Sequence, residues 1–305
     1  MNPAAIELKN CTKTFRGKIA VHDLSLTVEP GTVYGLVGDN GAGKTTTIKM
    51  LLGLLPPSRG SVSVLGCDPQ KDHVEIMKRT GYVSENRELY DWMTVSEILW
   101  FNAQFYSTWD NDLVQRTMRS MELNPKQKIK HLSRGMRAKV AMLLAMGHKP
   151  DLLILDEPSS GLDPLVRREI LEHIIAIIQS EGRTVFLSSH LIDEVERIAD
   201  RVGILCDGDM MRDESLDAIK ETSKRIRVAW NGDMPDPGQF KNVRRIDQSG
   251  REEAYFTQCF NDNVLDQFRE RHPASLEVEA LGLEEIVVET IRAQKHFLKS
   301  LEKVG

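Results

Sequence analysis

Short runs of apolar and β-branched residues open the chain and predict strands at residues 6–8, 19–28 and 32–37. The third run leads directly into a glycine-rich loop and then into a helical pattern, which Pro56 is expected to end. The opening pattern therefore predicts a strand, a loop and a helix in that order.

Two later runs, residues 152–155 and 184–187, are apolar at nearly every position. Strands of this kind are typical of a parallel sheet that is covered on both faces. The pattern between them predicts a helix at 166–179. Together these elements favour an α/β fold with a mostly parallel core sheet and an antiparallel edge formed by the first strands.

The stretch 94–147 has mostly helical spacing, which predicts a helical subdomain at about 86–147. In its first part we expect Ile98, Phe101 and Phe105 to share one helix face.

The character of the chain changes near residue 220, and we expect a cassette at 1–220 and a small α+β domain at 221–305. In the second domain the pattern predicts strands at 224–230, 243–247, 254–258 and 276–280 and helices at 263–271 and 283–302. The last helix carries an apolar stripe made of Leu283, Val287, Ile291, Leu298 and Leu301. The stripe favours a face buried within the domain, and a partner site is the alternative.

Composition narrows the classes of function. The 305 residues include 40 basic and 45 acidic ones, for a net charge of −5, which argues against a protein that coats nucleic acid. The four cysteines are scattered without metal-binding spacing. No apolar run approaches the roughly 20 residues that span a bilayer, and the N-terminus lacks a signal sequence. We therefore expect a chain in the cytoplasm that has reduced thiols and no nucleic-acid partner.

The glycine-rich loop has the spacing of a Walker A phosphate-binding motif. Its glycines let backbone N–H groups approach phosphate oxygens, and the helix that follows adds partial positive charge. Lys44 would contact the β- and γ-phosphates, and the Thr45 hydroxyl would bind Mg²⁺. We expect ATP to contact Gly38, Asp39, Asn40, Gly41, Ala42, Gly43, Lys44, Thr45 and Thr46.

The apolar run at 152–155 ends in Asp156 and Glu157, which matches a Walker B motif. Asp156 would hold Mg²⁺, and Glu157 would polarise the attacking water. The alternative is an ordinary helix N-cap, but an upstream Walker A loop favours catalysis.

Three further segments, Leu132-Ser133-Arg134-Gly135-Met136, Ser160-Gly161-Leu162-Asp163 and Ser188-Ser189-His190, complete the set. With them the chain resembles the nucleotide-binding subunits of ATP-binding-cassette (ABC) transporters over about residues 5–215. It resembles most the exporter ATPases whose membrane subunits are separate polypeptides. The implied fold is an ABC-type P-loop NTPase cassette with a small C-terminal α+β domain.

The resemblance implies a composite site in which two cassettes meet head to tail. Ser133 and the N–H of Gly135 would contact the γ-phosphate held by the other cassette, near Asp163 of the D-loop. Ser133 would also act as a helix N-cap. His190 would contact the γ-phosphate as the switch histidine, and an ordinary histidine is the alternative.

Four positions depart from the common pattern of the family. Arg134 stands where glycine is usual, and Asp39 stands where proline is usual and is expected to face solvent. Phe15 stands where a tyrosine stacks on adenine; it keeps the ring, with a core phenylalanine as the alternative. Glu85 stands where a glutamine contacts Mg²⁺ and couples to the membrane subunit.

The function implied is that of an ATPase subunit that powers transport, with export favoured over import. Its implied partners are membrane permease subunits on separate chains and a second cassette, as a homodimer or a heterodimer. The chain would then lie on the inner face of the cell membrane. Trp92, Trp100, Trp109 and Phe105 fall near the implied docking surface, but ordinary helical core is favoured for them.

Three other classes of function fit the sequence less well. A ribosome-acting ABC protein usually carries two cassettes, and only one Walker A loop is present. A chromosome-maintenance ATPase would need long heptad arms between Walker A and the signature segment, which leave no room here. A regulatory module that binds ATP without hydrolysing it is disfavoured by Glu157.

Overall fold

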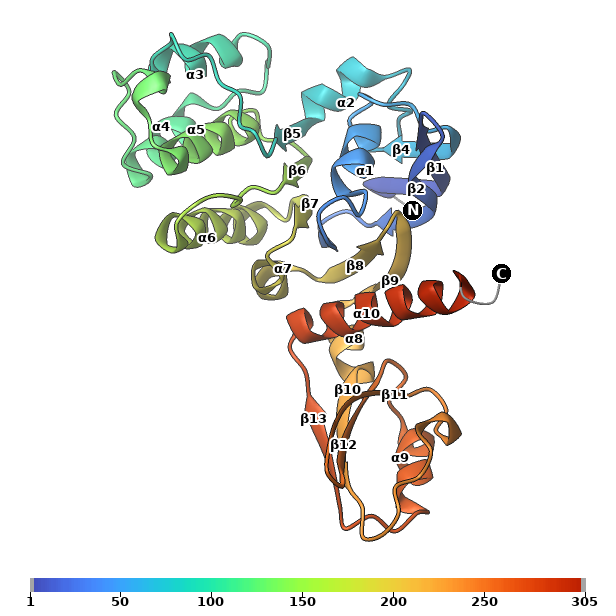
Figure 1. Cartoon of the computed structure of the whole chain (residues 1–305). Helices are drawn as coiled ribbons and strands as arrows, with labels where there is room; N and C mark the ends of the chain where they lie inside the picture. Colours follow the sequence, from blue (N-terminus) through green and yellow to red (C-terminus); the bar gives the residue numbers. More distant parts are fainter. Residues whose placement is uncertain (1–2, 303–305) are drawn as a thin grey trace. The chain divides into compact units, whose positions relative to one another are not determined.

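The structure, a computed structural model, describes the chain over residues 3–302, and its side chains over 3–172, 174–175 and 182–295 (Figure 1). The chain divides into two compact units, Met1–Asp213 and Glu214–Gly305. The division lies before the boundary near 220 expected from sequence. Ser215 caps helix α8 (Leu216–Thr222), and this helix packs against α10 (Leu283–Glu302) in the second unit.

The first unit contains a six-stranded sheet of order β5-β6-β7-β3-β8-β9. Neighbouring strands from β5 to β8 run parallel. All residues of β3, β6 and β7 are buried, as a sheet covered on both faces requires. The strands are β3 (Val33–Val37), β5 (Thr80–Val83), β6 (Leu152–Asp156), β7 (Thr184–Ser189), β8 (Arg201–Cys206) and β9 (Asp209–Ser215).

A second sheet in the same unit is antiparallel, with the order β2-β1-β4. It consists of β1 (Ile6–Phe15), β2 (Lys18–Val28) and β4 (Arg59–Val64). The strand predicted at 6–8 is therefore longer, because irregular pairing with β2 continues it to Phe15. The two sheets confirm the predicted parallel core with an antiparallel edge.

Seven helices surround these sheets in the described part of the first unit. They are α1 (Lys44–Leu51), α2 (His73–Arg79), α3 (Val95–Ala103), α4 (Asn111–Ser120), α5 (Arg134–Met146), α6 (Pro164–Glu181) and α7 (Ile192–Ile198). Helix α1 ends at Leu51, before Pro56, because Leu54 and Leu55 both donate their N–H to the Lys49 carbonyl and close the last turn. The expectation that proline ends this helix was wrong.

The helical subdomain holds α3, α4 and α5 together with the 3₁₀ turn Ile129–His131 (Figure 1). Ile98 is buried in α3, but the helix ends at Ala103. Phe105 lies beyond it and is 62% exposed. The predicted helix face shared by Ile98, Phe101 and Phe105 was wrong for this reason.

The second unit is an α+β unit whose antiparallel sheet has the order β11-β12-β10-β13. Its elements are β10 (Lys224–Ala229), a 3₁₀ turn (Pro237–Gln239), β11 (Arg244–Ser249), β12 (Glu252–Thr257), α9 (Asp262–Arg269) and β13 (Ser275–Ala280), besides α8 and α10. Aromatic rings of Trp230, Phe240, Tyr255 and Phe268 form part of its core.

The stripe on α10 is buried at Leu283, Val287 and Ile291, which favours an internal face over a partner site. Leu298 and Leu301 lie outside the residues whose side chains are described. Within residues 3–302, none of the helices combines the length and apolarity needed to cross a bilayer.

Candidate active site

A cavity of about 360 Å³ surrounds the loop that joins β3 to α1. Its lining consists of Ala20, Asp39, Asn40, Gly41, Ala42, Gly43, Lys44, Thr45, Thr46, Glu85 and Glu157. The structure therefore gathers residues 39–46 of the Walker A loop, Glu157 and Glu85 in one place, whereas Gly38 does not line the cavity. The cavity lies at the carboxyl ends of the parallel strands, where open α/β sheets bind ligands.

The loop shape depends on glycine where it enters the helix. Gly43 has φ +110° and is the N-cap of α1, with no side-chain cap. A Cβ added to Gly43 would lie 2.6 Å from the Ala20 carbonyl oxygen. The N-terminal N–H groups of α1 therefore face the cavity without competing side chains, as anion binding requires.

Lys44 is 6% exposed and lies within the loop. Its Nζ donates to the carbonyl oxygens of Gly38 at 2.7 Å and Asp39 at 3.3 Å. It also forms an ion pair with Glu157 Oε1 at 3.3 Å. The lysine thus occupies a buried position with acceptors that phosphate oxygens can replace.

Asp156 lies at the end of β6 and is 2% exposed. Burial raises the pKa of its carboxyl group, while hydrogen bonds from Ser188 and Thr45 act in the opposite direction. The Ser188 hydroxyl donates to Asp156 Oδ1 at 2.6 Å, and the Thr45 hydroxyl donates to it at 3.3 Å. The Thr45 hydroxyl oxygen and the Asp156 carboxylate, which are oxygen ligands of the kind that Mg²⁺ prefers, therefore lie side by side.

Glu157 is held at several points and is 4% exposed. Its φ of +49° is uncommon for a residue with a side chain. The Glu157 N–H donates to the carbonyl oxygen of Ser188 at 3.1 Å and to its hydroxyl at 3.2 Å. Glu157 Oε2 lies 2.6 Å from His190 Nδ1 and accepts from the His190 N–H at 3.2 Å. His190 is therefore part of the Glu157 site.

Two residues of the site, Ser188 and Arg87, have contacts that were not predicted from the sequence. Ser188 is paired with Asp156 in the register of β7 against β6. A polar residue at the end of an otherwise apolar strand was the available signal. Arg87 donates to the carbonyl oxygens of Glu157, Pro158 and Ser160, and no sequence signal indicated this contact.

Ser133, Gly135 and Asp163 do not line the cavity. The Ser133 hydroxyl accepts from the Met136 N–H at 3.2 Å, which confirms that it is the N-cap of α5. Asp163 Oδ1 accepts from the Val166 N–H at 3.2 Å at the start of α6. A Cβ on Gly135 would lie 2.7 Å from Val166 Cγ1, so glycine allows α5 and α6 to approach closely.

The structure also shows the surroundings of three positions that depart from the common pattern of the family. Phe15 is 43% exposed at the end of β1 with Lys13 Nζ 5.2 Å from its ring centroid, so it is not a core residue. It does not line the cavity, and its stacking on adenine stays a prediction. Asp39 is exposed, as expected, and Glu85 lines the cavity.

Four aromatic side chains, Tyr90, Trp92, Phe101 and Phe105, contact one another and form what we call the aromatic patch. Trp92 is 67% exposed and Phe105 is 62% exposed. Trp100 on α3 is also exposed, whereas Trp109 is half-buried and its ring packs against Gly147. The helical-core interpretation was therefore wrong for Trp92, Trp100 and Phe105, because they lie outside the packed faces of the subdomain.

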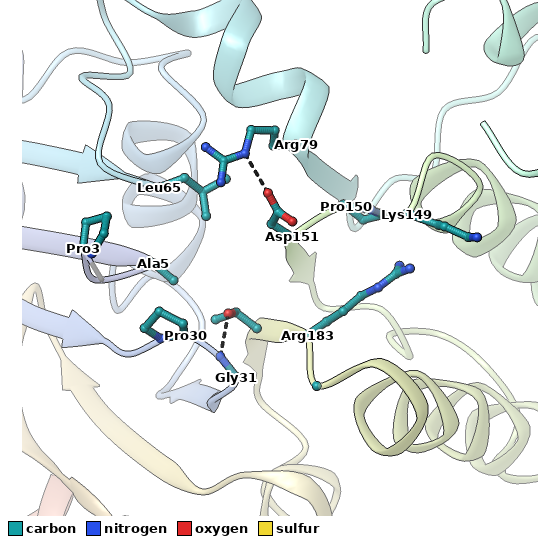
Figure 2. Close-up of a pocket in the computed structure, with 12 residues that line it drawn as sticks. Pro3, Ala5, Pro30, Gly31, Leu65, Arg79, Lys149, Pro150, Asp151 and Arg183 are labelled. Atoms are coloured by element: carbon teal, nitrogen blue, oxygen red, sulfur yellow. Dashed lines mark hydrogen bonds and ion pairs between the residues drawn. The ribbon is translucent and has the colours of Figure 1, made fainter. Parts of the chain in front are cut away.

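A larger pocket of about 480 Å³ lies at the opposite, amino ends of the strands (Figure 2). Residues just before β3, β6 and β7 line it. Arg79 Nε forms an ion pair with Asp151 Oδ2 at 2.6 Å, and both side chains are labelled in Figure 2. The Gly31 N–H donates to the Thr184 hydroxyl at 3.0 Å. These contacts tie the sheet together, and no phosphate-binding loop is present, so the smaller cavity is the candidate site.

Comparison with known proteins agrees with this geometry. The family model described as ABC transporter matches residues 21–160. The chain is 37% identical over 219 residues to the uncharacterized ABC transporter ATP-binding protein YhcH of Bacillus subtilis (strain 168), covering 70% of this chain and 72% of that protein. It is 33% identical over 222 residues to the bacitracin transport ATP-binding protein BcrA of Bacillus licheniformis, covering 72% of each.

A solved structure described as an ATP binding subunit of an ABC transporter superimposes with a TM-score of 0.65 at 30% identity. The match covers 71% of this chain and 92% of that one. The fold, the phosphate-binding cavity and the sequence identities together show that the chain belongs to the ABC transporter ATP-binding proteins, the family of ATPases that drive ABC transport.

Proposed function

We propose that this ATPase powers export through membrane subunits on separate chains, with Glu157 as the general base. The observation that carries the proposal is the continuous chain of contacts from Lys44 through Glu157 to His190 beside the phosphate-binding loop. A chain that only binds ATP has no need of a buried carboxylate held at this point.

Each residue has a distinct part in hydrolysis. Lys44 exchanges its carbonyl and carboxylate acceptors for the β- and γ-phosphate oxygens. Glu157, freed from Lys44, accepts a proton from the attacking water. His190 keeps the Glu157 carboxylate oriented and contacts the γ-phosphate when it is present.

Magnesium fits the oxygen atoms at the carboxyl end of β6. Thr45 and Asp156 would hold it, with Glu85 as a further oxygen ligand on the cavity wall. Among the described residues, no group of three His, Cys, Asp or Glu side chains could hold a metal ion. Mg²⁺ would therefore be bound jointly with ATP phosphates, whose charge it neutralises.

The site is completed by a second cassette. Ser133 is exposed and does not line the cavity of its own chain, although the start of α5 offers N–H groups suited to phosphate. A head-to-tail dimer would place Ser133 and Gly135 of one chain against the γ-phosphate of the other. We propose a homodimer.

The membrane partner would dock on the aromatic patch. Clusters of exposed aromatic side chains mark interaction sites, because their apolar surface stays in contact with water unless a partner covers it. The similarity to a bacitracin transport protein supports a role in export. In this arrangement the chain lies in the cytoplasm on the inner face of the membrane.

Two substitutions test the site. Glu157→Gln keeps shape but removes the base, so ATP hydrolysis should fall by about 10²–10⁴-fold while ATP still binds. Light scattering with Mg-ATP should then show a dimer, and adding Ser133→Arg should abolish it. Glu172→Gln, an exposed carboxamide substitution on α6, is the matched control and should hydrolyse ATP at the normal rate.

A Glu157→Gln protein with the normal hydrolysis rate would contradict the assignment of the base. A monomer that holds ATP would contradict the homodimer and indicate a different cassette as the partner.

A further inference from the structure

Arg87 occupies a buried position that its sequence surroundings do not explain. It follows β5 in the segment that carries Glu85, and it is 9% exposed. Its Nη2 donates to the carbonyl oxygens of Glu157 at 3.2 Å, Pro158 at 2.6 Å and Ser160 at 3.1 Å. One guanidinium group thus contacts three carbonyls of the segment that contains Glu157.

This contact carries an energetic cost. Burial lowers the pKa of the Arg87 guanidinium from its usual value, and the charge of Glu85 offsets the effect in part. Its Nε has no hydrogen-bond partner among the described residues. Burying a cation costs more desolvation free energy than burying an apolar side chain of similar size. The position of Arg87 is therefore not explained by stability alone.

The carbonyl contacts complete the restraint on Glu157. Its left-handed backbone costs energy and persists only where neighbours hold it. Ser188 at the end of β7 binds the Glu157 N–H, and Arg87 binds the Glu157 carbonyl oxygen. The peptide groups on the two sides of Glu157 are therefore fixed from two different segments of the chain.

We infer that Arg87 is a positioning residue that fixes the backbone of residues 157–160 and thereby aims the Glu157 carboxylate at the attacking water. The inference rests on the proposed role of Glu157 as the base. Arg87 does not line the cavity around the phosphate-binding loop, so its effect would reach the reaction only through Glu157. An arginine suits this task because its planar group is rigid, whereas a lysine is a flexible point donor.

The test measures ATP hydrolysis by the full chain. Arg87→Met keeps length but removes every donor, and kcat should fall on the order of 10²-fold, since small displacements of a reacting group have effects of this size. KM for ATP should stay within about threefold, because the phosphate contacts remain. Arg87→Lys should recover part of the lost rate.

Arg183→Met is the matched control. Arg183 is 8% exposed, close to the value for Arg87, but it lies before β7 at the opposite end of the sheet. Removing it tests what the loss of any buried arginine does to this unit. Its kcat should stay within about twofold of the normal value.

A double substitution separates positioning from a general structural effect. In the Glu157→Gln background, Arg87→Met should lower the residual rate by less than about twofold, because residues that act as a unit are not additive. A normal kcat in Arg87→Met, or a full further loss in the double variant, would overturn the inference. Glu157→Gln with a normal rate would instead contradict the role of Glu157 itself.

If Arg87→Met does not fold, Arg87→Gln and Arg87→Lys replace it in both backgrounds. A fall in kcat at unchanged KM that vanishes with Glu157→Gln supports the inference. An unchanged kcat in the folded Arg87→Gln variant overturns it.

Discussion

At the scale of single residues, the polar side chains of the site already contact one another. Lys44 pairs with Glu157, which pairs with His190, and all three come from different segments of the chain. ATP must therefore compete with Glu157 for the Lys44 ammonium. In the structure, the carboxylate of Glu157 takes the place beside Lys44 that a phosphate oxygen would take.

This competition predicts the effect of Glu157→Gln on affinity. The neutral amide releases Lys44 more readily and no longer repels the γ-phosphate, so a non-hydrolysable ATP analogue should bind roughly fivefold more tightly, equivalent to about 1 kcal/mol. Fluorescence titration is done in the Ser133→Arg background, which by the proposed interface should prevent dimerisation, so that the affinity of the monomer is measured. The Glu172→Gln control should leave affinity unchanged, and equal affinities in all three proteins would exclude the competition.

A second residue-scale prediction concerns acid stability. Burial lowers the pKa of His148 to about 4, and its ring stacks on Tyr106 with centroids 3.9 Å apart. The folded state therefore keeps His148 neutral, while the unfolded state binds a proton below its ordinary pKa of about 6.5. The contribution of His148 to stability is present above pH 6.5 and is lost as the pH falls. By pH 4 the free energy of unfolding should have decreased by roughly 3 kcal/mol.

His148→Phe keeps a flat ring that cannot be protonated. Urea unfolding between pH 7 and pH 4.5 should show a smaller acid-induced loss in His148→Phe than in the unchanged protein. The same substitution at His131, which is exposed, is the control. Identical pH dependence of His148→Phe and the unchanged chain would contradict the prediction.

At the scale of elements, helix ends serve both folding and function. Thr94 forms a capping box with Glu97 at the start of α3, and Ser133 caps α5. Both caps satisfy N–H groups that lack partners within the helix. Of the two helices, only α5, which Ser133 caps, is also proposed to contact the ATP bound by a second cassette.

The two caps therefore allow a matched comparison. Ser133→Ala and Thr94→Ala should each lower the unfolding free energy by about 0.5–2 kcal/mol, measured by urea denaturation. Only Ser133→Ala should also reduce the ATP-dependent dimer of the Glu157→Gln protein, because in the proposed dimer the serine hydroxyl contacts phosphate across the interface. A similar loss of dimer in both variants would indicate a stability effect alone.

At the scale of the whole molecule, the site residues all belong to the first unit. Strand β9, the last in its sheet, ends at Ser215. A chain of residues 1–215 keeps that sheet and the cavity intact, so we expect its affinity for a fluorescent ATP analogue to stay within about twofold. A folded truncation that fails to bind ATP would show that the second unit takes part in the site.

The aromatic patch leads to a prediction about membrane association. Trp92→Ser with Phe105→Ser removes exposed rings and should release the protein from the membrane fraction of cells that make its partner, with ATP binding intact. Exposed Val74→Ser on α2 is the control and should leave the fractionation unchanged. Membrane recovery equal to that of the unchanged protein would exclude the patch as the docking surface.

Much of the fold followed from local pattern. The strands at 152–156 and 184–189 were predicted within two residues, because a strand buried on both faces must be apolar at every position. The strand β1 was predicted too short, since its polar second half is held by pairing with β2 rather than by burial. Phe105 was misplaced because helical spacing does not show where a helix ends.

The sequence by itself determined the family, the phosphate-binding loop and the identities of Lys44, Asp156 and Glu157, because phosphate binding needs consecutive residues with special backbone freedom. Only the tertiary structure decided which groups meet. It paired Ser188 with Asp156, joined His190 to Glu157, and brought Arg87 to the carbonyls of residues 157–160. These contacts join segments that are neighbours only through the order of strands in the sheet, and no local pattern encodes that order.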